Sequence, residues 1–295
     1  MRPTALIPAL CCVVALVLSF LCLFAGHKKG FMEDYHYLTL NTSRIGQNLV
    51  NSTLDLPDNP FTNLINNVTS SFGNEINDAT ADLAEALGIE DWYSAHLLDY
   101  CYGDYTPAAL ANATVKQDDI HKNISGCSNR TAAFAFNPTT IIENALNESG
   151  VDVSLQDLNW PDDIQRGIDA LRILTKTMFI LYCIAIGFIG VSLLAALPAV
   201  FASGRLAACL NILVATLAFI AIGLASALST AVIVKGADVI NKYGQEVGVE
   251  AHKGSKFMAI TWAATAAMFV ALVLWCVETC IGHRRRRGTY VAKHG

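Results

Sequence analysis

The cysteines are the residues with the most readily recognised chemistry in this sequence. Nine are present, and only Cys101 and Cys127 lie in the long polar segment between the first two apolar runs. Two thiols in an oxidising compartment are expected to pair, and closing a loop of this length restricts the unfolded chain by about 3 kcal/mol. The sequence therefore predicts a Cys101–Cys127 disulfide, the alternative being two unpaired thiols.

Acceptor sites for N-glycosylation are a second chemical feature. The Asn-x-Ser/Thr pattern is weak evidence when it occurs once, because chance produces it in a stretch rich in asparagine. Here it occurs seven times, always within the same polar segment, which predicts that this segment reaches the secretory lumen and then the cell exterior. The acceptor residues are Asn41, Asn51, Asn67, Asn112, Asn123, Asn129 and Asn147.

The other cysteines lack the spacing of a redox site. Cys11 and Cys12 are adjacent in the first apolar run, and Cys276 and Cys280 lie in the last one. A membrane thiol oxidoreductase needs a closely spaced reactive pair near the outer surface, whereas a cysteine buried in a helix is usually an inert apolar residue. Because a basic run follows them, Cys276 and Cys280 are candidate palmitoylation sites.

We assign no catalytic residue, metal ligand or cofactor. The acidic pairs at 118–119 and 162–163 are better explained by a solvated loop and a helix N-terminus. His96 and His121 do not have the spacing of metal ligands. The apolar runs contain no histidine and almost no ionisable residue, unlike most transporters and channels. A membrane redox enzyme or a transporter is therefore the lesser alternative, and we expect no enzyme.

Four apolar runs are the elements that must position these residues. The chain is 53% hydrophobic and only 15% charged, which is too apolar for an ordinary soluble domain. The runs cover 4–24, 177–201, 206–234 and 257–281. Each is long enough, at about 1.5 Å rise per residue, to cross a hydrocarbon layer roughly 30 Å thick. Since lipid offers no hydrogen-bond partner to an open backbone, the runs predict four helices.

The charge distribution predicts the orientation of these helices. Arg205 lies between the second and third runs and four arginines follow the last run, so both sites are expected in the cytoplasm. Segment 27–175 has eight Lys or Arg and twenty-one Asp or Glu, a difference of −13, and is expected outside. Lys28 and Lys29 oppose this orientation weakly. A cleaved signal peptide is the alternative for the first run, but its apolar core is too long and lacks an A-x-A-like site.

We therefore predict a mainly α fold, with a four-helix transmembrane bundle and a disulfide-stapled, N-glycosylated extracellular domain between helices 1 and 2. Residues 1–26 form the first helix with a short cytoplasmic N-terminus, 27–175 the extracellular domain, and 176–281 the remaining helices. Residues 202–205 form a cytoplasmic turn, 235–256 a second extracellular loop, and 282–295 a basic cytoplasmic tail. The tail carries a candidate contact for anionic lipid, or a simple topology signal, in Arg284, Arg285, Arg286 and Arg287.

Local patterns predict three elements in the extracellular domain. Apolar residues at helical spacing over 61–87 predict an amphipathic helix that Gly88 ends. Alternation over 35–40 predicts a short strand. A third helix is expected to begin near Asp162 and to continue into the second span.

Several short motifs also match a known family. One runs Leu87-Gly88-Ile89-Glu90-Asp91-Trp92-Tyr93-Ser94 and leads to Tyr100-Cys101. Others are 37–43, Cys127-Ser128, Phe136-Asn137-Pro138, Gly254-Ser255-Lys256-Phe257 and Trp262. In these residues the chain resembles the fungal cortical-patch (eisosome) and PalI family of claudin-like four-span proteins, whose signature falls on Trp92, Tyr93, Cys101 and Cys127. The Trp-Gly-Leu-Trp motif of true claudins is absent, which argues against a junction-like polymer.

The resemblance implies a plasma-membrane protein that organises cortical (eisosome-like) domains of a fungus and affects cell-wall integrity and endocytosis. The other branch of the family assists ambient-pH sensing and usually has a long cytoplasmic tail. Only 282–295 follows the last span here, so the domain-organising branch is favoured. The implied partners are membrane lipids, other membrane proteins in homo- or hetero-oligomers, and cell-wall components. No basic patch suited to nucleic acid is present.

Overall fold

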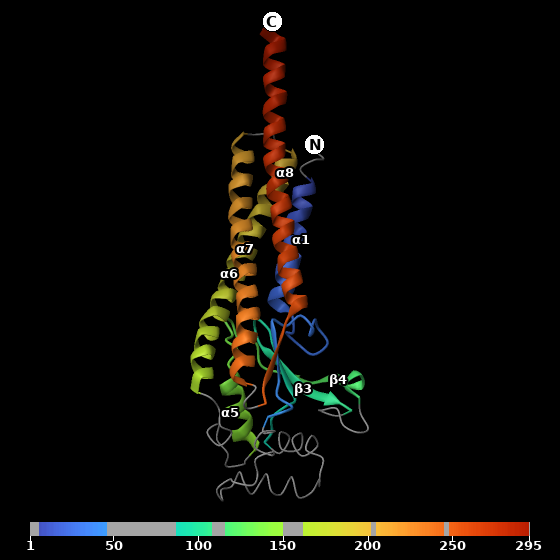
Figure 1. Ribbon diagram of the computed structural model, residues 1–295. Helices are drawn as coiled ribbons and strands as arrows, with labels where there is room; N and C mark the ends of the chain where they lie inside the picture. Colours follow the sequence, from blue (N-terminus) through green and yellow to red (C-terminus); the bar gives the residue numbers. More distant parts are fainter. Residues whose placement is uncertain are drawn as a thin grey trace, which may run out of the picture. The chain divides into compact units, whose positions relative to one another are not determined.

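The computed structural model describes residues 6–45, 87–107, 116–149, 162–201, 205–244 and 248–294. Its elements, labelled where there is room in Figure 1, are α1 (Leu6–Phe24), β1 (Leu38–Asn41), β2 (Trp92–Ala95), β3 (Tyr100–Thr106), the short 3-10 helix η2 (Gln117–Asp119), β4 (His121–Cys127), α5 (Pro138–Ser149), α6 (Asp162–Phe201), α7 (Arg205–Gly244), β5 (Glu250–Lys253) and α8 (Ser255–His294). The amphipathic helix predicted over 61–87 lies outside the described residues.

The chain divides into two compact units. We call Met1–Phe24, Thr177–Ser229 and Lys256–Gly295 the helical bundle. We call Ala25–Lys176 and Thr230–Ser255 the sheet domain. The sheet domain therefore contains residues from two separate parts of the chain, the second of which precedes α8.

The prediction of four membrane-spanning helices is confirmed by length and composition. The candidate spans are Leu6–Phe24, Arg166–Pro198, Cys209–Gly244 and Ser255–Cys280. The helix expected to begin near Asp162 does so and continues as α6.

Two helices continue beyond the segments predicted from hydropathy. Helix α7 runs to Gly244 and is followed by strand β5, so 235–256 contains regular structure where a loop was expected. Helix α8 similarly continues through most of the predicted tail, to His294. Apolar composition marks the part of a helix that lies in lipid, whereas its hydrogen-bond ladder can extend beyond it.

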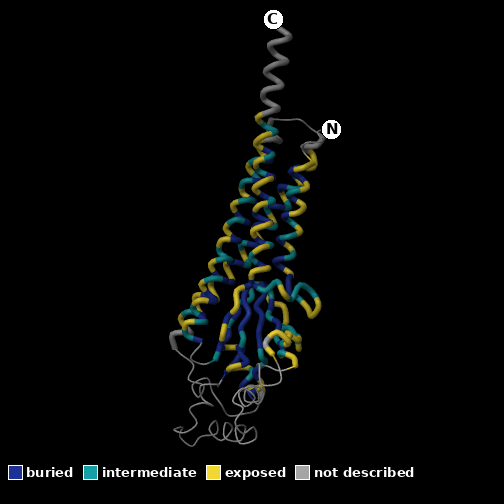
Figure 2. Tube along the Cα trace, turned by 45° about the vertical axis from the view of Figure 1, so that its right-hand side comes forward, coloured by how far each residue is buried: buried dark blue, intermediate teal, exposed yellow. Residues whose placement is uncertain are grey.

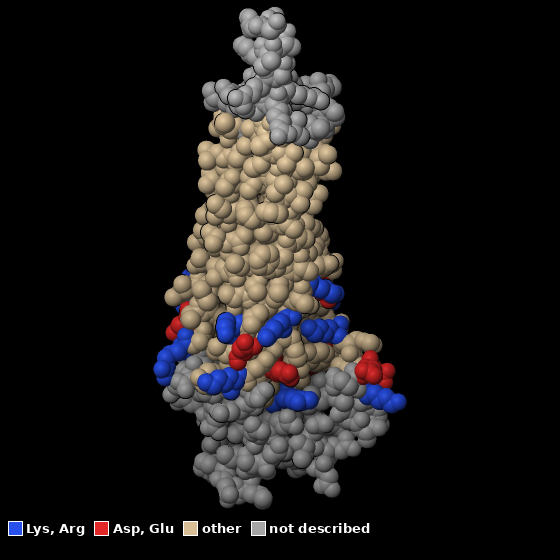
Figure 3. All heavy atoms as spheres, turned by 45° about the horizontal axis from the view of Figure 1, so that its top comes forward, with Lys and Arg blue, Asp and Glu red and all other residues tan. Residues whose placement is uncertain are grey.

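The helical bundle presents large apolar side chains on its surface and small ones inside. Leu194 is 67% exposed and Leu213 is 59% exposed, whereas Ala15, Ala185 and Ala218 are fully buried. Exposed and buried residues alternate along each helix (Figure 2). On the face drawn in Figure 3, Lys, Arg, Asp and Glu gather in one band, and the long described surface on one side of that band has no charged residue. This distribution suits helices surrounded by lipid.

A group of hydroxyl side chains joins three helices inside the bundle. The Tyr182 hydroxyl of α6 is hydrogen-bonded to Thr261 of α8 and lies 3.3 Å from Ser229 Oγ of α7. Ser226 Oγ of α7 lies 2.7 Å from the hydroxyl oxygens of both Thr261 and Thr265. All five residues are buried. The hydroxyls thereby satisfy one another where lipid and apolar side chains cannot.

The sheet domain is built on a five-stranded antiparallel sheet in the order β4-β3-β2-β1-β5. Strand β1 overlaps the strand predicted over 35–40. It pairs Leu38 with Ala95 of β2 on one side and with Lys253 of β5 on the other. Residues of β1 and β2 are buried almost throughout (Figure 2). Because both faces are covered, burial does not alternate along these strands as it does along a half-buried strand.

Glycine is required where β5 joins α8. A Cβ on Gly254 would collide with the carbonyl oxygen of His36 and lie 2.8 Å from that of Tyr37. The Gly254 N–H also donates to the Tyr37 carbonyl oxygen at 3.1 Å. The backbone of the segment before β1 therefore packs directly against Gly254.

Helix α5 begins at the Phe136-Asn137-Pro138 motif. Asn137 is the N-cap, because its Oδ1 accepts from the Thr140 N–H at 3.4 Å and its carbonyl accepts from Ile141 at 3.1 Å. Pro138 occupies the first helical position, where its missing N–H has no cost. Phe136 is 1% exposed and anchors the start of the helix in the core.

Candidate functional site: the disulfide-bonded sheet

The two faces of the sheet carry different chemistry. Side chains alternate between faces along a strand, and Ser94 of β2 pairs with Cys101 of β3 while Tyr93 pairs with Tyr102. Trp92, Ser94 and Cys101 therefore share one face, which we call the disulfide face. Tyr93 and Tyr102 lie on the other, which we call the tyrosine face.

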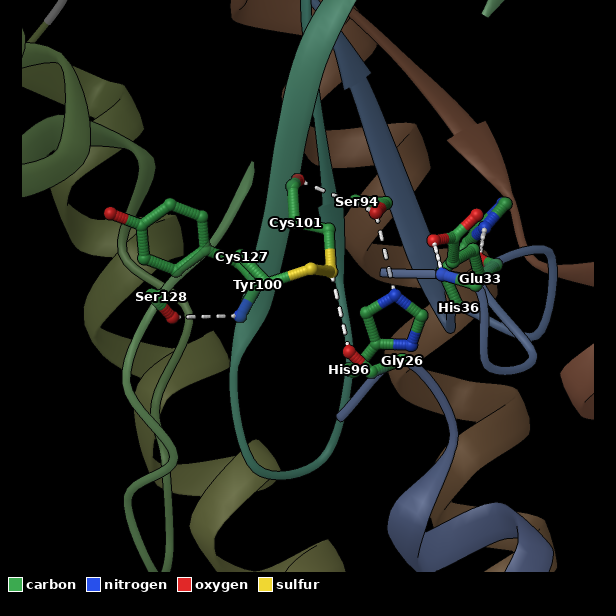
Figure 4. The surroundings of a disulfide bond; sticks show 10 residues. Gly26, Glu33, His36, Ser94, His96, Tyr100, Cys101, Cys127 and Ser128 are labelled. Carbon is green, nitrogen blue, oxygen red and sulfur yellow. Dashed lines mark hydrogen bonds between the residues drawn. A yellow bond between two sulfur atoms is a disulfide. The ribbon is translucent and has the colours of Figure 1, made fainter. Parts of the chain in front are cut away.

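The predicted disulfide joins neighbouring strands. Cys101 of β3 and Cys127 of β4 stand opposite each other in the register and are bonded, which confirms the pairing. Next to the bond, the Tyr100 N–H donates to Ser128 Oγ at 3.1 Å, and the Ser128 N–H donates to the Tyr100 carbonyl at 2.8 Å (Figure 4). The bond thus fixes the register of β4 where the chain leaves the sheet.

The segment after α1 packs against the disulfide. The carbonyl oxygen of Gly26 lies 3.3 Å from Cys101 Sγ (Figure 4). Because a disulfide sulfur carries no hydrogen, this is a packing contact. Gly26 has φ +75°, and a Cβ there would collide with the His96 ring. Both its backbone conformation and its surroundings therefore require glycine.

His96 is a buried, neutral imidazole. It is 1% exposed, and burial, with the nearby His36 ring, lowers its pKa to about 3. Ser94 Oγ lies 3.4 Å from both His96 Nε2 and the Cys101 carbonyl oxygen, so it can bridge the imidazole to the backbone of β3. His96 therefore supports the disulfide face and does not titrate near neutral pH.

A carboxyl group is buried in the β2–β3 turn. The His96 N–H donates to the Asp99 carbonyl at 2.9 Å and closes the turn. Asp99 is 0% exposed, and neither of its side-chain oxygens has a hydrogen-bond partner. Burial raises the pKa of Asp99 to about 6, although Arg130 acts in the opposite direction. An ionised carboxylate here costs folding free energy.

Trp92 contacts the two neighbouring strands β3 and β4. Trp92 is 2% exposed, and its Nε1–H donates to the Asp104 carbonyl of β3 at 3.3 Å. Lys122 Nζ of β4 lies 5.1 Å from the centroid of the Trp92 ring, which is within the range of a cation–π interaction. Trp92 thereby connects β2 to both β3 and β4.

Acidic side chains gather beside Trp92. Burial raises the pKa of Glu90 to about 7, and the neighbouring Asp104 carboxyl adds to the effect. Asp104 Oδ2 accepts from Ser125 Oγ at 3.1 Å, and Asp91 Oδ2 accepts from the Tyr105 N–H at 2.7 Å. Protonation of Glu90 relieves the repulsion within this group.

The tyrosine face is an aromatic cluster. The ring centroid of Tyr100 lies close to those of four other aromatic residues. The distances are 6.0 Å to Tyr102, 6.2 Å to Tyr93, 5.9 Å to Phe134 and 6.4 Å to Phe136. The Tyr93 hydroxyl accepts from the Glu90 N–H at 3.1 Å, and burial raises the Tyr93 pKa. Aromatic pairs at these distances pack favourably. Tyr93 therefore connects this cluster to the turn before β2.

Asn241 is a structural residue that sequence reasoning missed. From helix α7, its Nδ2 donates to the Ala251 carbonyl of β5 at 3.0 Å, and its Oδ1 accepts from the Ala251 N–H at 2.5 Å. The side-chain amide of Asn241 therefore satisfies the backbone groups of Ala251 that a further strand would otherwise bond at this edge of the sheet. A single Asn in a helix gives no signal in the sequence.

The described glycosylation sites differ in exposure. Asn123 of β4, Asn129 and Asn147 of α5 are exposed. Asn41 of β1 is partly buried, and its Oδ1 accepts from the Ser43 N–H at 3.1 Å and from Ser43 Oγ at 2.7 Å. Asn51, Asn67 and Asn112 lie outside the described residues.

The remaining predicted residues lie in the helical bundle. All cysteines other than Cys101 and Cys127 are free, and Cys276 and Cys280 are exposed on α8. The arginines at 284–287 lie in the last part of α8. Among the residues that the structure describes, no group of three His, Cys, Asp or Glu could hold a metal ion.

Comparisons with known proteins now give the family. The profile of the SUR7/PalI family matches residues 4–274. Over 203 residues the chain is 28% identical to a protein of Schizosaccharomyces pombe described as SUR7 family protein pun1, and the match covers 62% of this chain and 61% of that relative. No solved structure matches significantly. The matched range includes the first three candidate spans, most of the fourth, the Trp92 motif and both disulfide cysteines, and the chain therefore belongs to the SUR7/PalI family of multi-pass membrane proteins.

Proposed function

We propose that this protein is a non-enzymatic organiser of cortical domains in the plasma membrane. Membership of the SUR7/PalI family across residues 4–274 is the observation that carries the proposal. The bundle surface supports it, because large apolar side chains face outwards where lipids and other membrane proteins would contact them. The disulfide supports it further, since such bonds persist in oxidising compartments and at cell surfaces.

In this proposal the sheet domain faces the cell exterior and both chain termini face the cytoplasm. Glycans occupy the exposed Asn123, Asn129 and Asn147, which have free space around their side chains for a sugar. Asn41 remains without a glycan, because its side chain is engaged by Ser43 within the sheet. The arginines that begin α7 and end α8 then lie at the inner leaflet.

Glycosidase treatment tests this orientation. We expect the wild-type protein to run faster on a gel after removal of N-glycans. Replacing Asn123, Asn129 and Asn147 each by Gln should remove one step of that shift, whereas Asn41→Gln, the matched control, should leave it unchanged. A wild-type protein whose mobility is unaffected by glycosidase would contradict the orientation.

Imaging tests the proposed role. A fluorescently tagged copy expressed from its own promoter should form static puncta at the cell cortex. Deletion of the gene should reduce resistance to cell-wall stress and slow the uptake of an endocytic dye. Signal that is uniform in the plasma membrane, or confined to internal membranes, would contradict a cortical organiser.

The same proposal specifies partners of three kinds. Membrane lipids contact the bundle, with anionic headgroups near the arginines at 284–287. Further copies or other membrane proteins share the cortical domain, and cell-wall components contact the glycan-bearing surface. Chemical cross-linking in intact cells, followed by mass spectrometry, should recover cross-links from the sheet domain to wall or membrane proteins.

A second candidate, assistance to ambient-pH sensing, is favoured by two carboxyl groups. Burial raises the pKa of Glu90 to about 7 and that of Asp99 to about 6, so both change charge within the range of environmental pH. The double variant Glu90→Gln/Asp99→Asn should then impair growth at alkaline pH while the protein still reaches the cell surface. Normal alkaline growth of a strain that lacks the gene would eliminate this candidate.

A further inference from the structure

Three free cysteines are exposed on helices α7 and α8 of the bundle. Cys209 lies near the start of α7, and Cys276 and Cys280 lie one turn apart near the end of the apolar part of α8. By contrast, Cys12 and Cys22 of α1 are buried in the bundle interior. The exposed thiols therefore do not serve the packing that explains the buried ones.

The packing of the bundle brings these three thiols to the same end. Ala215 of α7 and Trp275 of α8 belong to one buried cluster, against which Ile212 packs. Further along α7, Ser226 is bonded to Thr261 of α8, so the two helices are antiparallel. Residues before Ile212 on α7 and residues after Trp275 on α8 therefore continue in the same direction.

The distances along the axis follow from helix geometry. Cys209 precedes Ile212 by three residues, and Cys276 and Cys280 follow Trp275 by one and five. At about 1.5 Å rise per residue, all three lie within roughly 8 Å of the cluster along the helix axis. They consequently form one layer at the end of the bundle.

The same end carries the basic residues. Arg205 begins α7 four residues before Cys209, and Arg284 follows Cys280 by four residues. Four residues correspond to about 6 Å along a helix. Because arginines that flank membrane spans are typical of the headgroup layer, we expect the thiols just inside that layer, at the boundary with the hydrocarbon.

We propose that Cys209, Cys276 and Cys280 form an S-acylation site for long-chain acyl groups. This rests on the proposed orientation, which places the site at the cytoplasmic leaflet. There the sulfur, after losing its proton, attacks the carbonyl carbon of an acyl thioester. A new thioester forms, the bond to the carrier sulfur breaks, and the released carrier thiolate takes up a proton. The attached chain enters the same hydrocarbon layer that the exposed sulfur already faces, so no apolar surface is exposed to water.

Cys183 provides an internal control, because it is exposed yet lies far from this end. It adjoins Tyr182, which is bonded to Thr261 of α8. Thr261 is fourteen residues from Trp275, or about 21 Å along the helix. Exposure alone therefore does not predict acylation, and Cys183 should remain a free thiol.

An acyl-exchange assay on the full-length protein from its native membranes tests the proposal. Free thiols are blocked under denaturing conditions, thioesters are cleaved with neutral hydroxylamine, and each released thiol receives a mass tag. We expect three hydroxylamine-dependent tags on the wild type, two on Cys209→Ser, and none on Cys209→Ser/Cys276→Ser/Cys280→Ser. The control Cys183→Ser should keep three.

Two results would overturn the site: a wild type without hydroxylamine-dependent tags, or tags that persist in the triple variant. An unchanged tag number in Cys209→Ser would show that Cys209 of α7 is not part of the acylation site. Because the protein is denatured before the thiols are blocked, the reagents reach buried and exposed thiols alike in every variant. Glycosidase treatment of the same samples reports orientation separately, so a normal glycan shift without tags refutes acylation alone.

Discussion

The helical bundle and the sheet domain bury different kinds of side chain. Among the described residues, the ten largest fully buried side chains include only Tyr182 and Phe257 from the bundle, whereas Tyr37, Phe136 and others belong to the sheet domain. Water drives large apolar residues into the sheet domain. Lipid supplies no such force, so the bundle relies on small residues and hydrogen bonds. The two units should therefore respond differently to the same class of mutation.

Removal of the disulfide should have the largest effect, and it should be confined to the sheet domain. Cys101 and Cys127 are separated by 26 residues, and opening a loop of this length costs about 3 kcal/mol. We expect Cys101→Ser to lower the midpoint of thermal unfolding in detergent and to increase proteolysis near β4.

The matched control is Cys183→Ser, which removes a free, exposed thiol from the bundle and should leave both readouts unchanged. Equal destabilisation by the two substitutions would show that the disulfide does not stabilise the sheet domain.

Neutralising the buried carboxyl of the sheet domain should have the next largest effect, and it should stabilise. The pKa of Asp99 rises from 3.8 to about 6 on folding, so the folded state binds its proton more tightly. The contribution of Asp99 to the free energy of unfolding should fall as pH rises from about 4 to about 6 and then level off. Asp99→Asn should raise the free energy of unfolding by on the order of 2 kcal/mol at pH 7.

The measurement is the unfolding midpoint of the wild type and of Asp99→Asn between pH 4 and 8. Glu143→Gln is a suitable comparison, because Glu143 is an exposed carboxylate on α5. A pH profile that is the same for the wild type and Asp99→Asn would be incompatible with a buried, titrating Asp99.

Removing one hydroxyl from the bundle should have a smaller, destabilising effect. Thr261→Val keeps the shape of the side chain but leaves the hydroxyls of Tyr182 and Ser226 without this partner. We expect a loss of about 1 kcal/mol, measured by unfolding in mixed detergent.

Thr216→Val is the control, since the Thr216 hydroxyl donates only within its own helix, to the Ile212 carbonyl at 2.7 Å. If Thr261→Val and Thr216→Val were equally stable, the Thr261 hydroxyl would contribute nothing to joining the helices.

Removing the positive charge of Lys122 over the Trp92 ring should have the smallest effect. Lys122→Gln retains much of the side-chain length but removes the cation 5.1 Å from the ring centroid. We expect a loss of about 0.5 kcal/mol, together with a change in Trp92 fluorescence. Lys242→Gln, which removes a lysine beside Tyr243 of α7, should leave that fluorescence unchanged.

The sequence predicts the bundle better than it predicts the sheet. Apolar composition alone locates the four spans, because each must cross the lipid. It does not locate the end of α7 at Gly244, where the residues are polar and the helix continues on its own hydrogen bonds. Cys101 and Cys127 could be paired from their expected compartment, and Trp92 and Tyr93 were identified by family resemblance.

The strands were largely missed for a physical reason. Alternation identifies a strand only when one face meets water, and all four residues of β2 are buried. Strand β5 has only four residues and pairs with β1, which is distant in sequence. The contacts of Asn241 and the burial of Asp99 arise only in the folded chain. No local sequence pattern therefore identifies either residue.

The pairing of β1 with β5 also has a consequence for biosynthesis. Leu38 emerges from the ribosome well before its partner Lys253, roughly 200 residues later in the chain. Until then one edge of β1 has no strand beside it, and an open edge can associate with other chains. The sheet can be completed only when the residues just before the fourth span have been made. A nascent chain whose translation stops before β5 would therefore expose the unpaired edge of β1. Chaperones could bind this edge and so recognise an incomplete chain.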